Sequence, residues 1–313
     1  MANFQDNLLI LTNNIEKVIV GKRPVIDLAI ITLLCRGHLL IEDVPGLGKT
    51  MLARSMANSM SLRFKRIQFT PDLLPSDVTG VSIFNQKNSE FEFRPGPVFT
   101  NILLADEINR TTPRTQSSLL ESMEEHQITA DGTTYLLPKV FMVIATQNPI
   151  ELQGTYHLPE AQLDRFFMRI KIGYPSNDQE VRVMEMQIKD HPIHSVSPVI
   201  SEDALGTMQD AVSQVYIDKS IMQYIVKIID ATRKHPELLL GASPRGSLCL
   251  MRASQAMALL KGINYVEPSF VKLVTKPVLA HRIIMKPQSR LRGINEDTVL
   301  DDILNSIPAP VKK

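Results

Sequence analysis

The segment Glu42-Asp43-Val44-Pro45-Gly46-Leu47-Gly48-Lys49-Thr50 is the most informative part of this chain for its fold. It follows a short apolar run, His38-Leu39-Leu40-Ile41, and precedes a helical pattern from Met51 to Ser59. Glycines let backbone amides turn toward phosphate oxygens, and a helix that begins near Lys49 points its positive end at them. The lysine can reach the β- and γ-phosphates, and the threonine hydroxyl can ligate Mg²⁺. The spacing therefore predicts a strand, a phosphate-binding loop of the Walker A type and a helix.

One position departs from the usual Walker A pattern. Asp43 stands where that pattern has its first glycine. A short polar residue tolerates unusual backbone angles better than most, and Pro45-Gly46 can form the turn. An ordinary glycine-rich loop is the bland alternative, but Gly-Lys-Thr after Pro-Gly-Leu in this context favours phosphate binding.

An acidic pair follows the apolar run Ile102-Leu103-Leu104-Ala105. Asp106 is placed to hold Mg²⁺ directly or through water, and Glu107 to act as general base toward the attacking water. A strand that ends in Asp-Glu is common and means little alone. Its position about fifty-five residues after Lys49 is typical of P-loop NTPases, so we interpret it as a Walker B motif.

Three further polar residues complete the candidate machinery. Asn148 follows the apolar run Phe141 to Thr146 and can hydrogen-bond the nucleophilic water or the γ-phosphate, although Asn148-Pro149 alone also suits a turn. Arg165 ends a short predicted helix, and Arg245 lies in the first turn of another, directly after Pro244. Most arginines are solvated surface groups, but an arginine can neutralise the charge that develops on a γ-phosphate.

The apolar runs of the first half predict an α/β fold. Besides the runs that precede the phosphate loop and Asp106, they are Phe64 to Phe69, Val140 to Ala145 (the run before Asn148) and Met168 to Ile172. Continuous apolar character suits strands buried on both faces, which indicates a parallel sheet with helices on each side. Ligands bind such sheets at the carboxyl ends of the strands, where the polar motifs lie.

The pattern changes near Pro175, where we place a domain boundary between residues 1–174 and 175–313. Beyond it we find helical periods only, so the second domain is expected to be all helical. Ser176 is predicted to cap the first helix of that domain, and residues 308–313 to form a frayed tail.

Composition excludes several classes of protein. The 313 residues carry a net charge of +1 and an ordinary globular mix, which gives no bulk attraction to nucleic acid or to an anionic membrane. Cys35 and Cys249 are too few and too far apart for a disulfide framework or a metal cluster, so we expect buried free thiols. The N-terminus lacks a signal-peptide pattern, and no apolar run can span a bilayer, so a cytoplasmic location is expected.

Taken together, these motifs resemble the MoxR group of AAA+ ATPases, and their order and spacing hold from about Val20 to Arg282. The resemblance is carried by Glu42 to Thr50, Phe69-Thr70-Pro71-Asp72-Leu73-Leu74-Pro75-Ser76-Asp77, Ala105-Asp106-Glu107-Ile108-Asn109-Arg110, Ala145-Thr146-Gln147-Asn148-Pro149, Leu158 to Phe166 and Gly241-Ala242-Ser243-Pro244-Arg245. Asp43 is no anomaly in this group.

The resemblance implies a role for each matching residue. Asn148 corresponds to the sensor-1 asparagine, Arg165 to the arginine finger that reaches a neighbouring subunit's nucleotide, and Arg245 to the sensor-2 arginine of the lid. Gln68 is a weaker candidate for the polar residue that restrains the Walker B glutamate. The implied cofactors are ATP and Mg²⁺, with Thr50 and Asp106 at the metal. The nucleotide would lie against Val20, Gly21, Pro45, Gly46, Leu47, Gly48, Lys49, Thr50 and Met51.

The resemblance also implies an assembly. Members form rings, usually hexamers, and act as chaperone-like remodelers or complex-maturation factors, often with a partner that carries a von Willebrand factor A domain. Residues 78–99 resemble the helix-2 insert of this branch, and His126 to Leu137, with Asp131-Gly132 at its middle, is a strong hairpin signal that resembles the pre-sensor-1 hairpin. In ring relatives both elements face the central pore.

Other functions stay open at this point. A nucleic-acid motor should line its pore with basic or stacking residues. The hairpin has neither Lys nor Arg, and the insert has only Lys87 and Arg94, so we favour a protein client and expect no nucleic acid. A magnesium-chelatase-like subunit shares the architecture. A scaffold that binds ATP but barely hydrolyses it would not need Glu107, Asn148 and Arg165 together, and a small-molecule kinase would not need a separate helical domain.

Overall fold

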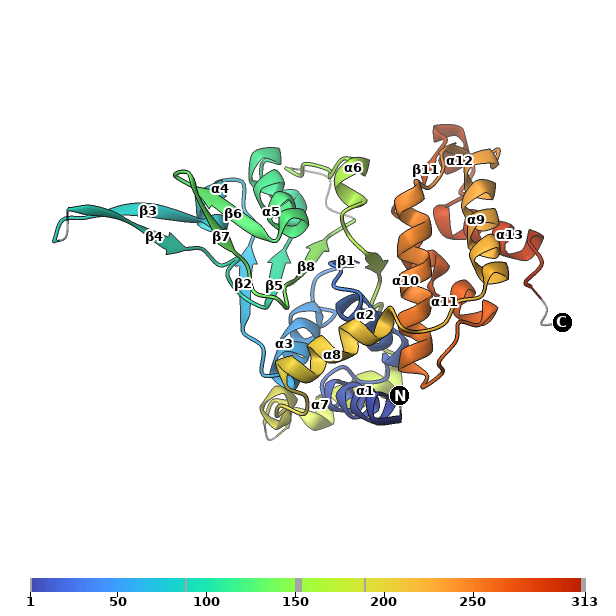
Figure 1. Cartoon of the computed structure of the whole chain (residues 1–313), viewed down its shortest axis with the longest axis horizontal. Helices are drawn as coiled ribbons and strands as arrows, with labels where there is room; N and C mark the ends of the chain where they lie inside the picture. The colour runs from blue at the N-terminus through green and yellow to red at the C-terminus, as the bar shows by residue number, and fades with distance from the viewer. Residues whose placement is uncertain (1, 88, 150–153, 189, 311–313) are drawn as a thin grey trace.

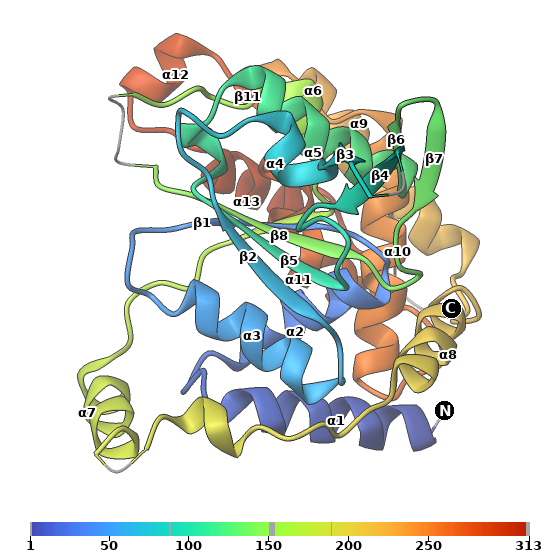
Figure 2. The same cartoon turned by 90° about the vertical axis from the view of Figure 1, so that its left-hand side faces the viewer.

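A five-stranded sheet forms the centre of the molecule. The structure is a computed structural model that describes residues 2–87, 89–149, 154–188 and 190–310. Neighbouring strands of the sheet are all parallel, as the apolar runs predicted (Figure 2). The strands follow the order β2 (Phe64–Gln68), β5 (Ile102–Asp106), β8 (Met142–Gln147), β1 (Leu39–Glu42), β9 (Met168–Ile170).

Helices cover both faces of this sheet. On one face Leu39 and Ile41 of β1 pack with α1 (Ala2–Glu16), α2 (Arg23–Leu34) and α3 (Lys49–Ser59). On the other, Leu40 joins a second apolar cluster with α5 (Pro113–Glu125). Successive side chains of a strand point to opposite faces, so a strand covered on both sides reads as continuously apolar.

Strand β2 differs from the prediction that it is buried on both faces. Only Ile67 of its five residues is buried, and Lys65, Arg66 and Gln68 are exposed. The reason is its position at the edge of the sheet, where one flank has no neighbouring strand among the described residues. Charged side chains are usual on such an edge, because they discourage pairing with another chain.

Two hairpins leave the core on the side away from the C-terminal helices (Figure 1). The first follows α4 (Pro75–Thr79) and pairs β3 (Gly80–Asn85) with β4 (Glu90–Pro95), within the predicted insert. The second pairs β6 (Gln127–Ala130) with β7 (Thr133–Leu136), as the Asp-Gly signal predicted. Asp131 and Gly132 turn the chain with φ of 50° and 76°, both left-handed, as a tight two-residue hairpin turn needs.

The C-terminal part is mainly helical. Ser176 caps α7 (Asn177–Met186) as predicted, with its side chain accepting from Gln179 N, and α8 (Glu202–Val212) follows. Both lie beside the α1–α3 layer of the core (Figure 1). A bundle on the other side contains α9 (Lys219–Lys234), α10 (Pro244–Leu260), α11 (Pro268–Leu279), α12 (Pro287–Leu291) and α13 (Glu296–Ser306).

The expectation of an all-helical second domain is wrong in one detail. Strand β10 (Leu238–Leu240) pairs antiparallel with β11 (Ile284–Met285) at one end of the bundle. Strands of three and two residues are too short to show an alternating pattern, and their pairing joins segments far apart in sequence. The boundary near Pro175 stays a prediction, because one apolar cluster runs through the core helices and the bundle together.

Two other expectations concern composition. Cys35 and Cys249 are free thiols, as predicted, although both are half-buried rather than fully buried. Among the described residues, no helix combines the length and apolar character needed to cross a membrane.

Candidate functional site

The phosphate loop connects β1 to α3 and surrounds an open hollow. Gly46 and Gly48 have φ of 89° and 84°, so both occupy the left-handed region that glycine tolerates best. A side chain added at Gly46 would meet nothing within 4 Å, so the loop is open toward solvent there. Backbone N–H groups at the start of α3 face the same region, which is a ready anion site.

Asp43 has a structural reason to replace glycine. One carboxylate oxygen accepts hydrogen bonds from Ile172 N at 2.8 Å and Gly173 N at 2.7 Å. The other accepts from Val44 N at 3.1 Å. Glycine could not make these bonds, so the aspartate ties the phosphate loop to the chain that leaves β9.

Lys49 lies at the floor of the loop, where it is 9% exposed. Its ammonium group donates to the Asp43 carbonyl oxygen. Burial lowers the pKa of Lys49, and the negative charges of Asp106, Asp43 and Glu107 oppose that shift. A partly desolvated ammonium that faces two Walker B carboxylates is a suitable counter-ion for phosphates.

The Walker B carboxylates lie across this hollow from the loop. Thr146 of β8 donates to Asp106 Oδ1 at 2.6 Å, and its hydroxyl accepts from Glu107 N at 2.9 Å. Glu107 itself has φ of 56°, and its Oε2 accepts from Gln68 at 2.7 Å and from Arg110 at 3.1 Å. Gln68 therefore makes the contact that its resemblance to a glutamate-restraining residue implied.

Most of the residues predicted to contact the nucleotide or the metal line two adjoining cavities. The first, of about 250 Å³, is lined by Pro45, Gly46, Gly48, Lys49, Thr50, Met51, Arg66, Gln68, Asp106, Glu107 and Asn148. The second, of about 240 Å³, includes Val20, Leu47, Ile172 and Pro175 beside the loop glycines and Met51. The polar first cavity suits phosphates and the apolar second suits a base.

These cavities fit the implied cofactors. A hydroxyl from Thr50 and a carboxylate from Asp106 are the hard oxygen ligands that Mg²⁺ prefers. Gly21 does not line the base cavity directly; its carbonyl accepts from Gln179 of α7 at 3.3 Å and so fixes the segment beside Val20.

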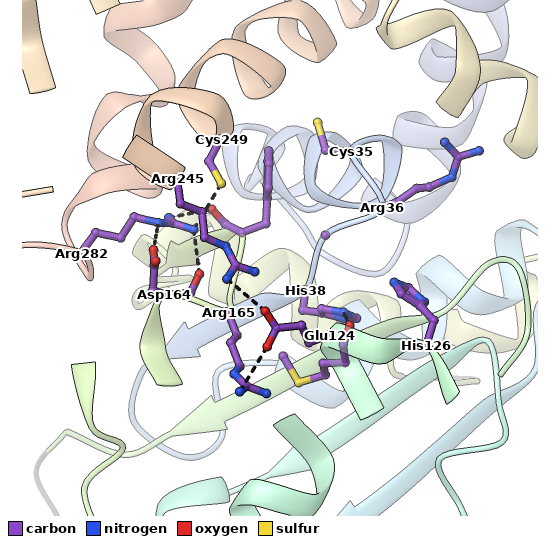
Figure 3. A pocket seen from close by; sticks show the side chains of 13 residues that line it. Cys35, Arg36, His38, Glu124, His126, Asp164, Arg165, Arg245, Cys249 and Arg282 are labelled. Carbon is purple, nitrogen blue, oxygen red and sulfur yellow. Dashed lines mark hydrogen bonds and ion pairs between the residues drawn. The ribbon is translucent and has the colours of Figure 1, made fainter. Parts of the chain in front are cut away.

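Arg165 and Arg245 lie elsewhere. Both line a separate cavity of about 200 Å³, which contains none of the phosphate-loop residues (Figure 3). Arg165 follows α6 (Glu160–Leu163), and Arg245 lies in the first turn of α10, as predicted. Glu124 of α5 stands between them, 3.1 Å from Arg165 and 3.4 Å from Arg245. We call these three residues the arginine cluster.

An ion pair between a buried arginine and a half-buried aspartate supports the segment that carries Arg165. Arg282, from the chain after α11, is 7% exposed and bonds Asp164 at 2.7 Å. The same guanidinium donates to the carbonyl oxygens of Phe166 at 2.6 Å and Phe167 at 3.1 Å. A guanidinium with five donors can satisfy several acceptors at once, so Arg282 fixes this turn against the helical bundle.

Sequence reasoning missed several residues of both sites. Arg66, Thr146 and Arg110 touch the Walker B carboxylates, and Glu124 and Arg282 organise the arginines. Arg66 has a signal that could have found it, because Arg66 and Gln68 are two residues apart on one strand and so share a face. For Glu124 and Arg282 no local signal exists, since their partners are distant in sequence.

Comparisons with known proteins agree with this geometry. Residues 38–168 match the family described as "ATPase family associated with various cellular activities (AAA)", and residues 230–303 match the AAA lid domain. The chain is 51% identical to the uncharacterized protein YeaC of Bacillus subtilis, over 96% of this chain and 94% of that one. It is 37% identical to the chaperone MoxR1 of Mycobacterium tuberculosis, over 95% and 80% of the two chains.

A solved structure extends the likeness to three dimensions. A protein from Cytophaga hutchinsonii that was assigned as an ATPase superposes with a TM-score of 0.92 at 38% identity, over 99% of this chain and 97% of that one. The family matches, the relatives that align along almost the whole chain and the shared fold lead to one conclusion: the chain belongs to the MoxR-type family of AAA+ ATPases.

Proposed function

We propose that this chain is a Mg²⁺-dependent, ring-forming ATPase whose site is completed by a neighbouring subunit. One observation carries the proposal: the phosphate cavity and the arginine cluster are separate in one chain. Arginines that serve a γ-phosphate must reach it, and these two line a different cavity, where both pair with Glu124. A second copy that presents its arginine cluster to the phosphate cavity would supply the missing positive charge.

Within one subunit the residues divide the work. Backbone N–H groups of the loop and Lys49 would bind the phosphates, and Thr50 and Asp106 would hold Mg²⁺. The metal, when bound, neutralises the charge that develops on the phosphate oxygens. Glu107 would take the proton of the attacking water, and Asn148, which lines the same cavity, would orient that water.

Glu107 must be released before it can act as a base. Gln68 and Arg110 both donate to the same carboxylate oxygen, at 2.7 and 3.1 Å. Both donors occupy an acceptor oxygen of the group that would take the proton of the attacking water. In this arrangement the glutamate is restrained, and hydrolysis requires that at least the Gln68 contact opens.

The two hairpins support a protein client. Phe93 of β4 stacks on Tyr135 of β7 with ring centroids 4.2 Å apart, so the hairpins form one unit. Phe91 is 74% exposed and Leu136 is 77% exposed on this unit. Exposed apolar side chains suit contact with unfolded polypeptide, and the scarcity of Lys and Arg on the two hairpins disfavours contact with a phosphate backbone. We therefore favour a chaperone-like remodeler over a nucleic-acid motor, and no contact specifically favours a chelatase-like subunit.

The finer points of assembly come from the family resemblance. We propose a hexameric ring in the cytoplasm and a partner protein with a von Willebrand factor A domain. The name of the relative from Mycobacterium tuberculosis describes it as a chaperone, which agrees with a protein client.

The experiment is specific ATPase activity against protein concentration, with mass measured by light scattering. Activity should rise as assemblies form. Arg165→Ala should bind ATP normally and lose roughly 10³-fold or more in turnover, as finger removal does in other NTPases. Mixing Arg165→Ala with Glu107→Gln should restore part of the activity, because an interface can pair an intact Glu107 with an intact Arg165. A fully active monomer would contradict the proposal.

A further inference from the structure

Strand β2 presents a second residue to the Walker B motif, besides Gln68. Arg66 donates to Asp106 Oδ2 through two nitrogens of its guanidinium, at 2.7 and 3.1 Å. It also donates to Gln68 Oε1 at 2.9 Å. β2 pairs in parallel with β5, with Gln68 opposite Asp106, so Arg66 reaches the carboxylate diagonally from the same face of the sheet.

Both carboxylate oxygens of Asp106 accept hydrogen bonds that a metal ion would have to compete with. Thr146 donates to Oδ1, and Arg66 occupies Oδ2 with two hydrogen bonds. Asp106 is 15% exposed and Arg66 48% exposed, so the carboxylate is the more shielded partner of the pair. A guanidinium in this position neutralises the carboxylate and repels a second cation from it.

We propose that Arg66 is the counter-ion of Asp106 in the subunit without nucleotide, and that Mg²⁺ must displace it to reach Asp106. This rests on the proposed Mg²⁺ site at Thr50 and Asp106. The Arg66–Asp106 pair therefore lowers the affinity of the nucleotide-bound site for Mg²⁺. Because Arg66 also holds Gln68, which in turn holds Glu107, displacement of Arg66 removes one support of the restraint on the base.

The experiment measures binding rather than turnover. A fluorescent ATP analogue is titrated into the full-length protein, once in EDTA and once in saturating Mg²⁺, and the ratio of the two Kd values gives the enhancement by Mg²⁺. Binding of Mg²⁺ to the nucleotide in solution is common to all variants and cancels when their ratios are compared. Arg66→Gln should increase the enhancement about two- to fivefold, the factor expected for one partly exposed ion pair.

Two variants control this result. Lys65→Gln removes the same charge from the neighbouring exposed position of β2, on the other face, and should leave the ratio unchanged. Arg66→Lys keeps the charge but loses the two-pronged geometry, so its ratio should lie between those of the parent and Arg66→Gln. Circular dichroism shows whether each variant is folded.

Other outcomes separate the two proposals. An unchanged ratio in Arg66→Gln would make Arg66 an ordinary surface ion pair, and a lower ratio would mean that it supports the metal-bound state; both overturn the inference. If the parent protein binds the analogue with no enhancement by Mg²⁺, the proposed Mg²⁺ site itself fails.

Discussion

The phosphate cavity and the arginine cluster differ in which charges await a partner: two carboxylates in the first and two arginines in the second. The carboxylates of the first, Asp106 and Glu107, are paired with Arg66, Gln68 and Arg110. The arginines of the second are paired with Glu124. Each half therefore carries an internal substitute for the charge that its functional partner would bring. In a single subunit these carboxylates and arginines already have partners, and in the proposed assembly nucleotide and a neighbouring subunit would replace those partners.

The two regions also differ in what fixes them. The phosphate cavity collects the ends of neighbouring strands in one sheet, so the sheet itself sets its geometry. The arginine cluster joins α5 and the turn after α6 to α10 of the helical bundle. Its geometry therefore depends on how the bundle docks on the core, and a change in that docking would move Arg245 relative to Arg165.

The largest effect is expected from breaking the acidic half. Glu107→Gln should lose about 10²- to 10⁴-fold in ATP turnover, because the amide cannot take the proton of the attacking water. Binding of ATP should persist, since Lys49 and the loop amides remain. The measurement is steady-state turnover beside the Kd of a fluorescent ATP analogue. Turnover at the parent rate would remove Glu107 from the role of base.

Lys49→Ala is the complementary variant, because it should impair nucleotide binding rather than turnover. It removes the positive group that faces the phosphates and should abolish measurable nucleotide binding at concentrations that saturate Glu107→Gln. Equal affinity in the two variants would show that Lys49 does not contact the phosphates.

A smaller effect is expected from breaking the pairing in the basic half. Glu124→Gln removes the charge that the two arginines share and should loosen them toward a neighbouring subunit's phosphate, with Arg165 still bonded to the Leu120 carbonyl oxygen at 2.7 Å. We expect the protein concentration at half-maximal specific activity to fall about two- to fivefold, because each exposed pair contributes about 0.2–1 kcal/mol. The control is Glu121→Gln, one turn earlier on α5 and also exposed. A higher concentration requirement would mean that Glu124 instead aligns the arginines for their task.

An effect of similar size, on stability rather than activity, concerns His38, which is buried against α5. His38 Nδ1 accepts from Val143 N at 3.0 Å, which leaves Nε2 to donate to the Met123 carbonyl at 3.0 Å. Burial lowers the pKa of His38 to about 4, although the bond to Met123 opposes the shift. The unfolded chain binds a proton near pH 6.5 and the folded one does not, so stability is complete above that pH and falls as pH decreases toward 4.

Burial of His38 predicts a measurable dependence of the free energy of unfolding on pH. Between pH 6.5 and 5.5 the free energy of unfolding should fall by about 1 kcal/mol through His38. His38→Gln should be less stable at neutral pH. Its free energy of unfolding, measured in urea, should also depend less steeply on pH. His157→Gln, at an exposed site, should keep the parent slope. An identical slope in His38→Gln would place the pH dependence on other groups, such as the buried His281, whose pKa is also lowered by burial.

Sequence reasoning performed well where local pattern and physics agree. The phosphate loop, the strands that precede Asp106 and Asn148, the Asp-Gly hairpin and the Ser176 cap all form as predicted. It failed at β2, which was read as a buried run although its edge position exposes Arg66. It also failed at β10 and β11, whose pairing no local pattern indicates.

Local sequence pattern was enough to predict the chemistry proposed for this protein. Lys49, Thr50, Asp106 and Glu107 follow strands of one parallel sheet, and the carboxyl ends of parallel strands must lie at one edge, so a phosphate and metal site could be derived from order and spacing. Which charges are paired became visible only in the folded chain. Arg66 with Asp106, Glu124 with two arginines and Arg282 with Asp164 join segments brought together by packing. An ion pair depends on distance in space rather than along the chain, so no sequence pattern specifies these partners.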